Sequence, residues 1–110
     1  MGIFVRGDVV DVPFPFSDLT QNKRRPAFVV RRLPGDDVIL CQITSRQIHG
    51  VRHVCVTAAD FGRGGLRSTS YVKPGHLFTA DSRIVVSVKG SLLPDKIDEI
   101  IGEIVDLIRN

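Results

Sequence analysis

The hydrophobic period of this chain changes once, near its C-terminus, and this change constrains the fold more than any other feature. After Pro94, apolar residues recur at spacings of three and four, at Ile97, Ile100, Ile101, Ile104, Leu107 and Ile108. The spacing predicts one amphipathic helix, with Pro94 at its first position and acidic residues in its first turn. The first ninety residues show short, alternating β-branched runs instead, so strands are expected to dominate there. The predicted fold is mainly β with a C-terminal helix.

Turn-forming residues divide the first ninety positions into short predicted strands. Strands are expected at 7–13, 26–33, 37–43 and 51–57, with shorter extended segments at 69–73, 76–80 and 84–89. The turn formers at 33–37 predict a hairpin, and Pro74-Gly75 is expected to break the chain. Residues 62–68 are rich in glycine and are predicted to form a mobile loop. Together these features indicate a small, strongly bent sheet or a partly open barrel.

Length and composition limit the class of protein. The chain has 110 residues, 43% hydrophobic and 25% charged, which predicts one soluble domain spanning residues 1–110. No run approaches the roughly 20 apolar residues of a membrane span and no secretion signal is recognised, so a cytoplasmic location without membrane contact is expected. Cys41 and Cys55 lie in apolar stretches and are interpreted as buried thiols. No His, Cys, Asp and Glu cluster has ligand spacing, so no metal or cofactor is expected.

Charge is distributed unevenly along the chain. Residues 91–110 contain 2 basic and 5 acidic residues, whereas residues 1–90 contain 13 basic and 7 acidic ones. A basic body of this kind suits the binding of a polyanion. Composition alone therefore indicates only a basic, β-rich domain.

Four stretches in the first half resemble one known family in their order and spacing. They are Arg6-Gly7-Asp8-Val9-Val10, Pro13-Phe14-Pro15-Phe16, Lys23-Arg24-Arg25-Pro26-Ala27-Phe28-Val29-Val30 and Gln42-Ile43-Thr44-Ser45. Together they closely resemble the MazF/PemK family of toxins from bacterial toxin–antitoxin pairs, with weaker similarity through 76–81 and 88–92 into the predicted helix. The resemblance implies an SH3-like small β-barrel of the MazF, Kid and CcdB type that forms a homodimer and is neutralised by a cognate antitoxin.

The resemblance also implies an activity and the residues that perform it. Members of the family are endoribonucleases that cut single-stranded mRNA without a metal ion, and the expected products carry a 2′,3′-cyclic phosphate. The family's Arg-Pro element places the catalytic arginine on Arg25, and its Ile-Thr-Ser element places the catalytic threonine on Thr44. These residue types suit the chemistry, because a guanidinium can bind two oxygens of a pentavalent phosphate while a hydroxyl donates a third hydrogen bond.

Further basic and polar residues near these positions are candidates for RNA binding. They are Lys23, Arg24, Ser45, Arg46, Arg67 and Lys73. The arginines at 46 and 67 are expected to contact phosphates and to position the strand without reading its sequence. Some plasmid-borne members of the family carry an Arg-x-Asp triplet later in the chain. The corresponding residues here are Lys73-Pro74-Gly75, which keep a basic side chain and lack the carboxylate.

The residues by themselves leave structural interpretations open. Arg24 and Arg25 are compatible with solvated surface charge, and Thr44 with a turn at the end of a strand. Phe14 and Phe16 are interpreted as core or loop anchors rather than as stacking platforms for bases.

Three other functional hypotheses remain at this stage, one of which is a catalytically dead RNA- or DNA-binding barrel that would bind without turnover. A two-histidine acid–base mechanism would use two of His49, His53 and His76, whose spacing gives little support. A CcdB-like toxin that binds DNA gyrase would be non-enzymatic and would need neither Arg25 nor Thr44.

Overall fold

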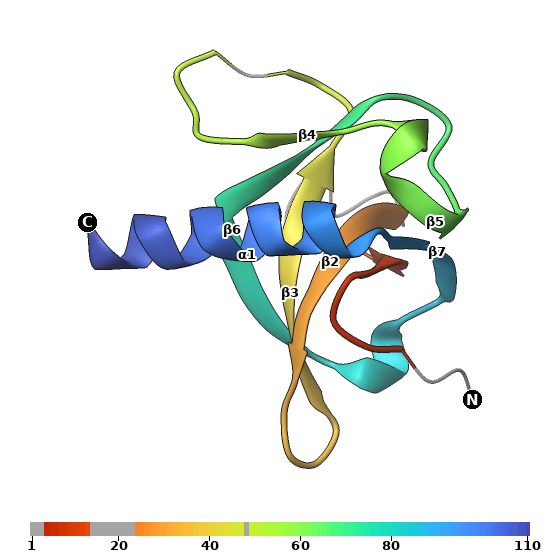
Figure 1. Ribbon diagram of the computed structural model, residues 1–110. Coiled ribbons are helices and arrows are strands. Elements are labelled where there is room, and N and C mark those ends of the chain that lie inside the picture. Colours follow the sequence, from red (N-terminus) through yellow and green to blue (C-terminus); the bar gives the residue numbers. More distant parts are fainter. Residues whose placement is uncertain (1–3, 14–23, 48) are drawn as a thin grey trace, which may run out of the picture.

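Seven strands of the described residues form one antiparallel sheet that curls into a half-barrel, and one helix packs against it (Figure 1). The computed structural model describes residues 4–13, 24–47 and 49–110. The strands are β1 (Asp8–Pro13), β2 (Arg24–Arg32), β3 (Asp37–Thr44), β4 (Val54–Val56), β5 (Phe61–Gly64), β6 (Ser70–Asp81) and β7 (Ser87–Leu92). Their order in the sheet is β4-β6-β3-β2-β1-β7-β5. The architecture confirms the prediction of a strongly bent, barrel-like sheet with a C-terminal helix.

Both faces of the sheet are covered, because strand residues alternate between two apolar clusters. Val9, Phe28 and Ile43 belong to the cluster beneath the helix, whereas Val10 and Val29 belong to the cluster on the opposite face. All five are completely buried. Neighbouring residues of one strand therefore stabilise different parts of the core, as the period of two requires.

The helix α1 (Pro94–Arg109) begins with proline and presents an apolar stripe to the sheet. Ile100 and Ile104 are its buried residues, and they join the cluster that contains Phe28 and Val72. The predicted helix is therefore confirmed, including proline in its first turn. None of the helices in the described ranges has the length and apolar character to cross a bilayer.

The glycine-rich segment differs from its prediction. Phe61–Gly64 forms β5 and pairs with β7, so the first part of the expected loop at 62–68 is a strand. Gly64 has a φ of 65°, and a Cβ there would collide with the carbonyl oxygen of Lys89. Glycine is therefore needed for the close approach of two backbones, which a propensity argument cannot detect.

The expected break at Pro74-Gly75 is also wrong, because β6 runs without interruption from Ser70 to Asp81. Its register with β3 shifts within this stretch: Ile43 lies opposite Val72, whereas Cys41 lies opposite Leu77. The extra residues of β6 form a bulge that accommodates a proline without an N–H donor.

The remaining strands begin or end a few residues away from their predicted bounds. The hairpin turn is confirmed between β2 and β3. The strand expected at 51–57 is confined to Val54–Val56, and the segment expected at 84–89 lies at Ser87–Leu92. Cys41 is buried as expected, whereas Cys55 is exposed because its side chain alternates outward between two buried valines of β4.

Candidate functional site

An open groove lies where β2 and β3 separate from each other. Their pairing ends at Ala27 opposite Gln42, while β2 continues along β1 to Arg24 and β3 continues along β6 to Thr44. The groove has a volume of about 470 Å³. Its lining comes from these strand ends, from β1 and β7, and from the segment before β6: Asp11, Arg24, Arg25, Pro26, Ile43, Thr44, Ser45, Gly65, Leu66, Arg67, Ser68, Ser70 and Lys89.

The groove brings together most of the residues predicted for the site. Arg25 and Thr44, which the resemblance makes catalytic, both line it, as do Arg24, Ser45 and Arg67. Arg25 and Thr44 are half-buried, and the other three are exposed. Three guanidinium groups within one open groove create a positive surface for an anionic ligand. Lys23, Phe14 and Phe16 lie outside the described residues.

Thr44 is held by a hydrogen bond of its side chain, whereas Arg25 is held by the conformation of its backbone. The Thr44 Oγ1 accepts a hydrogen bond from the backbone N–H of Arg46 at 3.1 Å, so the turn expected for this residue is present. The hydroxyl proton remains available to a ligand, because this bond uses Oγ1 only as an acceptor. Arg25 precedes Pro26, which lies opposite Asp11 in β1 and favours an extended backbone for Arg25.

Two predicted RNA-binding residues lie outside the groove. Arg46 and Lys73 line a narrow crevice together with Thr44, His53 and Tyr71. Lys73 is only 9% exposed, because it sits in the β6 bulge, where its carbonyl oxygen accepts a hydrogen bond from the Cys41 Sγ at 2.9 Å. Thr44 therefore borders both the groove and the crevice.

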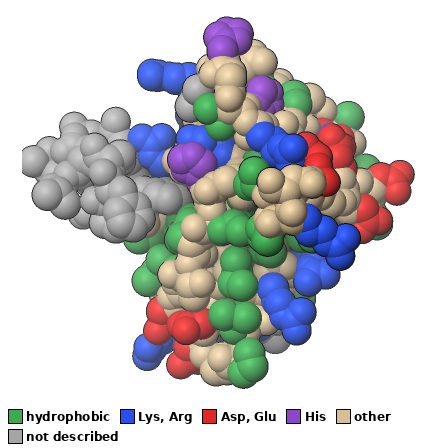
Figure 2. Space-filling model, turned by 90° about the vertical axis from the view of Figure 1, so that its left-hand side faces the viewer, with side chains coloured by type: hydrophobic (Ala, Val, Ile, Leu, Met, Phe, Trp, Pro, Cys, Tyr) green, Lys and Arg blue, Asp and Glu red, His purple; other side chains and the backbone are tan. Residues whose placement is uncertain are grey.

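His53 has a defined orientation in this crevice. Its Nδ1 lies 2.9 Å from the Val51 carbonyl oxygen, which can only accept, so a neutral ring with this hydrogen bond carries its proton on Nδ1. Nε2 is then an acceptor, and no described residue hydrogen-bonds to it. Tyr71 packs edge-on against the ring, with centroids 5.2 Å apart. His76 lies elsewhere on β6, where burial and the nearby charge of Lys73 lower its pKa. Figure 2 shows histidines near several Lys and Arg side chains, above a band of apolar side chains.

Sequence reasoning missed the two other charged residues that line the groove, Asp11 and Lys89. The Nζ of Lys89 lies 3.2 Å from Oδ2 of Asp11. These residues belong to β1 and β7, strands from opposite ends of the chain that pair in the sheet. Nothing in the sequence around either residue indicates the pair, because only the pairing of the two strands brings them together.

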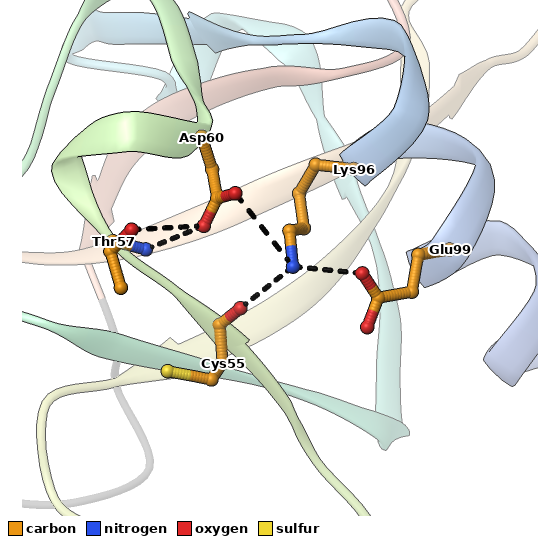
Figure 3. A network of polar contacts seen from close by, with 5 residues as sticks. All are labelled: Cys55, Thr57, Asp60, Lys96 and Glu99. Atoms are coloured by element: carbon orange, nitrogen blue, oxygen red, sulfur yellow. Dashed lines mark hydrogen bonds and ion pairs between the residues drawn. The ribbon is translucent and has the colours of Figure 1, made fainter.

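A second polar cluster anchors the start of α1 (Figure 3). None of its residues lines the groove. The Lys96 Nζ donates to the Cys55 carbonyl oxygen at 3.1 Å and to Glu99 Oε1 at 2.8 Å, and it lies 3.8 Å from Asp60 Oδ1. Asp60 in turn accepts the Thr57 backbone N–H at 2.8 Å. The cluster joins the helix to β4 and to the 3₁₀ turn Ala58–Asp60, which gives it a structural role.

Metal ligands do not gather in the part of the chain that the structure describes: no group of three His, Cys, Asp or Glu side chains there is arranged to hold an ion. The groove offers guanidinium groups, an ammonium group and hydroxyl groups instead. These groups bind phosphate oxygens by charge-assisted hydrogen bonds.

Residues 5–108 match the family model described as PemK-like, MazF-like toxin of type II toxin-antitoxin system. The chain belongs to this toxin family. The match spans nearly all of the sequence and confirms the resemblance found in its first half. It does not favour the alternative of a CcdB-like protein that binds gyrase. No curated protein matches the chain.

Solved structures show the same fold as this MazF-like toxin. MazF from Deinococcus radiodurans superimposes with a TM-score of 0.76 at 22% identity, covering 100% of both chains. The MazE–MazF complex from the same organism matches with a TM-score of 0.75 at 21% identity over 98% of each chain. An endoribonuclease from Mycobacterial species, in complex with its cognate antitoxin, matches with a TM-score of 0.67 at 17% identity over 96% of each chain. The predicted SH3-like barrel of the MazF type is thereby confirmed.

Proposed function

We propose that this toxin is an endoribonuclease that cuts single-stranded mRNA without a metal ion. The observation that carries the proposal is the convergence of Arg25 and Thr44, together with Arg24 and Arg67, in one open groove. One of the structural neighbours is named an endoribonuclease, which supports the same class of activity. An open, basic groove suits a single strand, whose phosphates and bases are both accessible.

In the proposed reaction, the 2′-oxygen of one nucleotide attacks the adjacent phosphorus and the bond to the 5′-oxygen breaks. Negative charge develops on the equatorial oxygens of the phosphorane. The Arg25 guanidinium stabilises this charge with two parallel hydrogen bonds, and the Thr44 hydroxyl donates another. The departing 5′-oxygen takes up a proton from water, so the products are a 2′,3′-cyclic phosphate and a 5′-hydroxyl.

The proton that leaves the 2′-hydroxyl needs an acceptor, and a guanidinium is a poor base near neutral pH. We assign this role to His53, which shares a crevice with Thr44 and whose Nε2 makes no hydrogen bond to another described residue. Replacing His53 with Gln is expected to lower kcat, because the amide cannot accept the proton as an imidazole nitrogen does. A variant with an unchanged kcat would assign the proton to another group.

The test of the proposed activity is cleavage of a fluorescent single-stranded RNA by the purified protein. Arg25→Ala is expected to lower kcat by about 10³-fold or more, as the loss of a transition-state arginine does. Arg31→Ala is the matched control, because Arg31 is an exposed arginine of the same strand that does not line the groove. Cleavage by Arg25→Ala at the wild-type rate would refute the assignment.

Metal independence and the nature of the ends are tested with the same RNA. Cleavage is expected to survive excess EDTA, and the products are expected to carry a 2′,3′-cyclic phosphate and a 5′-hydroxyl. Loss of cleavage on chelation, or products with a 5′-phosphate, would indicate metal-dependent hydrolysis.

The proposal includes two protein partners, a second copy of the chain and a cognate antitoxin. Exposed apolar side chains on α1, Val105, Leu107 and Ile108, support a homodimer, and a structural neighbour solved as a MazE–MazF complex supports the antitoxin. An antitoxin segment that covers the basic groove is expected to bind more weakly as salt rises. Sedimentation equilibrium tests the dimer, and titration of the antitoxin at several salt concentrations tests the occlusion.

A further inference from the structure

Asp11 is the one carboxylate among the described residues that line the groove. The charged side chains around it are basic: Arg24, Arg25, Arg67 and Lys89. A carboxylate repels phosphate, so its presence is unfavourable wherever the RNA backbone passes. A groove that bound only phosphates would bind them more tightly without Asp11. We therefore expect a different ligand group, one that a carboxylate can bind, at this position.

The contacts of Asp11 define what it offers to such a group. Its Oδ2 is 3.2 Å from the Nζ of Lys89, and its side chain is 15% exposed. Within the described ranges, Oδ1 makes no hydrogen bond or ion pair. A lysine ammonium has three donors, so two remain after one is directed at Asp11. The pair thus presents a free acceptor beside free donors.

Backbone hydrogen bonds from neighbouring segments hold both residues. The carbonyl oxygen of Asp11 accepts the Val86 N–H at 2.9 Å, and the carbonyl oxygen of Lys89 accepts the Gly65 N–H at 3.1 Å. A Cβ on Gly90, directly after Lys89, would lie 2.5 Å from a carbonyl oxygen of β5. β5 and β7 are therefore packed backbone to backbone beside Lys89. The ion pair between Asp11 and Lys89 thus has a fixed position in the wall of the groove.

We propose that the Asp11–Lys89 pair determines sequence specificity by hydrogen-bonding the edge of one unpaired RNA base. This inference rests on the proposed function. The Watson–Crick edge of a base carries a donor and an acceptor side by side, such as N4–H and N3 of cytosine, which the carboxylate and the ammonium complement. A phosphate carries acceptors only and is repelled by Asp11. The sugar-phosphate backbone therefore runs along Arg24, Arg25 and Arg67, with one base turned toward Asp11.

The experiment compares cut sites rather than total activity. Wild type, Asp11→Asn, Lys89→Met and the control Arg31→Ala are each incubated with a long single-stranded RNA, and the new 5′ ends are mapped by sequencing. Asp11→Asn keeps the shape of the side chain while removing its charge and one acceptor oxygen. Both groove variants are expected to relax the base preference at the same position of the cut motif, by about 5- to 150-fold. The control is expected to keep the wild-type motif.

The outcomes separate this inference from the proposed function. If the wild type cuts RNA and both groove variants keep its motif, base readout by the pair is wrong and the endoribonuclease stands. A uniform loss of rate at all sites, with the motif unchanged, also overturns the inference and makes the pair structural or catalytic. If the folded wild type cuts no RNA, the proposed function itself fails. Lys89 is 45% exposed, so Lys89→Met keeps the test decisive even if Asp11→Asn does not fold.

Discussion

Replacing Lys96 with Met is expected to lower the free energy of unfolding by about 2 kcal/mol. The side chain of Lys96 is only 16% exposed, and its charged hydrogen bond to the Cys55 carbonyl is of a type that contributes roughly 1.5–3 kcal/mol. The contact with Glu99 adds little, about 0.5 kcal/mol or less, because Glu99 is 53% exposed and solvent screens the pair. Met keeps the apolar stem of the side chain and removes the ammonium.

The assay is thermal and urea unfolding of three variants beside the wild type. Lys96→Met is expected to lower Tm by about 8–16 °C, since 1 kcal/mol corresponds to about 4–8 °C in a small domain. Glu99→Gln isolates the exposed ion pair, and its small effect is expected to vanish at high salt. Arg109→Met controls for the loss of an exposed basic side chain from the same helix. Equal losses for Lys96→Met and Glu99→Gln would refute the role of the backbone carbonyl.

The stability difference between wild type and Lys96→Met is also expected to depend on pH. Burial acts to lower the pKa of Lys96, but the hydrogen bond to Glu99 and the charges of Asp60 and Glu99 outweigh it, so the pKa is raised overall. A raised pKa in the folded state means that the stabilisation is fully present below pH 10.5, the ordinary value. The difference between wild type and Lys96→Met is therefore expected to stay constant up to that pH and to shrink as the pH rises further.

Three further predictions concern the core, the thiols and the groove wall. Ile100→Ala is expected to lower the free energy of unfolding by about 2–5 kcal/mol, because Ile100 is fully buried. Ile108 is 69% exposed, so Ile108→Ala is expected to change it by less than about 0.5 kcal/mol; urea unfolding measures both. Iodoacetamide is expected to label Cys55 alone in the native protein and Cys41 only after denaturation, because burial raises the pKa of Cys41 to about 12; mass spectrometry after labelling checks this. Gly90→Ala is expected to disrupt the β5–β7 pairing and to lower Tm and RNA cleavage together, and a variant with normal Tm would contradict the tight packing.

The sequence predicted those elements whose causes are local. The change of period after Pro94 located the helix, and the turn at 33–37 located the hairpin, because both depend on neighbouring residues. β5 was missed because Gly64 is required by the backbone of β7, which lies far away in the sequence. The bulge that tolerates Pro74 was missed for a similar reason, since it is defined by the register with β3.

The candidate site could be predicted only where the family motif supplied its residues. The resemblance located Arg25 and Thr44, and the structure places both at one groove. It did not distinguish Lys73, which β6 buries in its bulge, from basic residues that face the groove. The pair formed by Asp11 and Lys89 has no sequence signature, because it depends on the pairing of β1 with β7.

The pairing of β1 with β7 also sets when the groove can exist during synthesis. The Ser91 hydroxyl donates to Asp8 Oδ1 at 2.7 Å across 83 residues of chain, one of several contacts that join the first strand to the last. Folds dominated by such distant contacts have a high contact order and form slowly, in milliseconds to seconds. A chain still emerging from the ribosome has β1 but not β7, and so it lacks one wall of the groove. The groove, with Asp11 on β1 and Lys89 on β7, is therefore complete only after β7 has been synthesised.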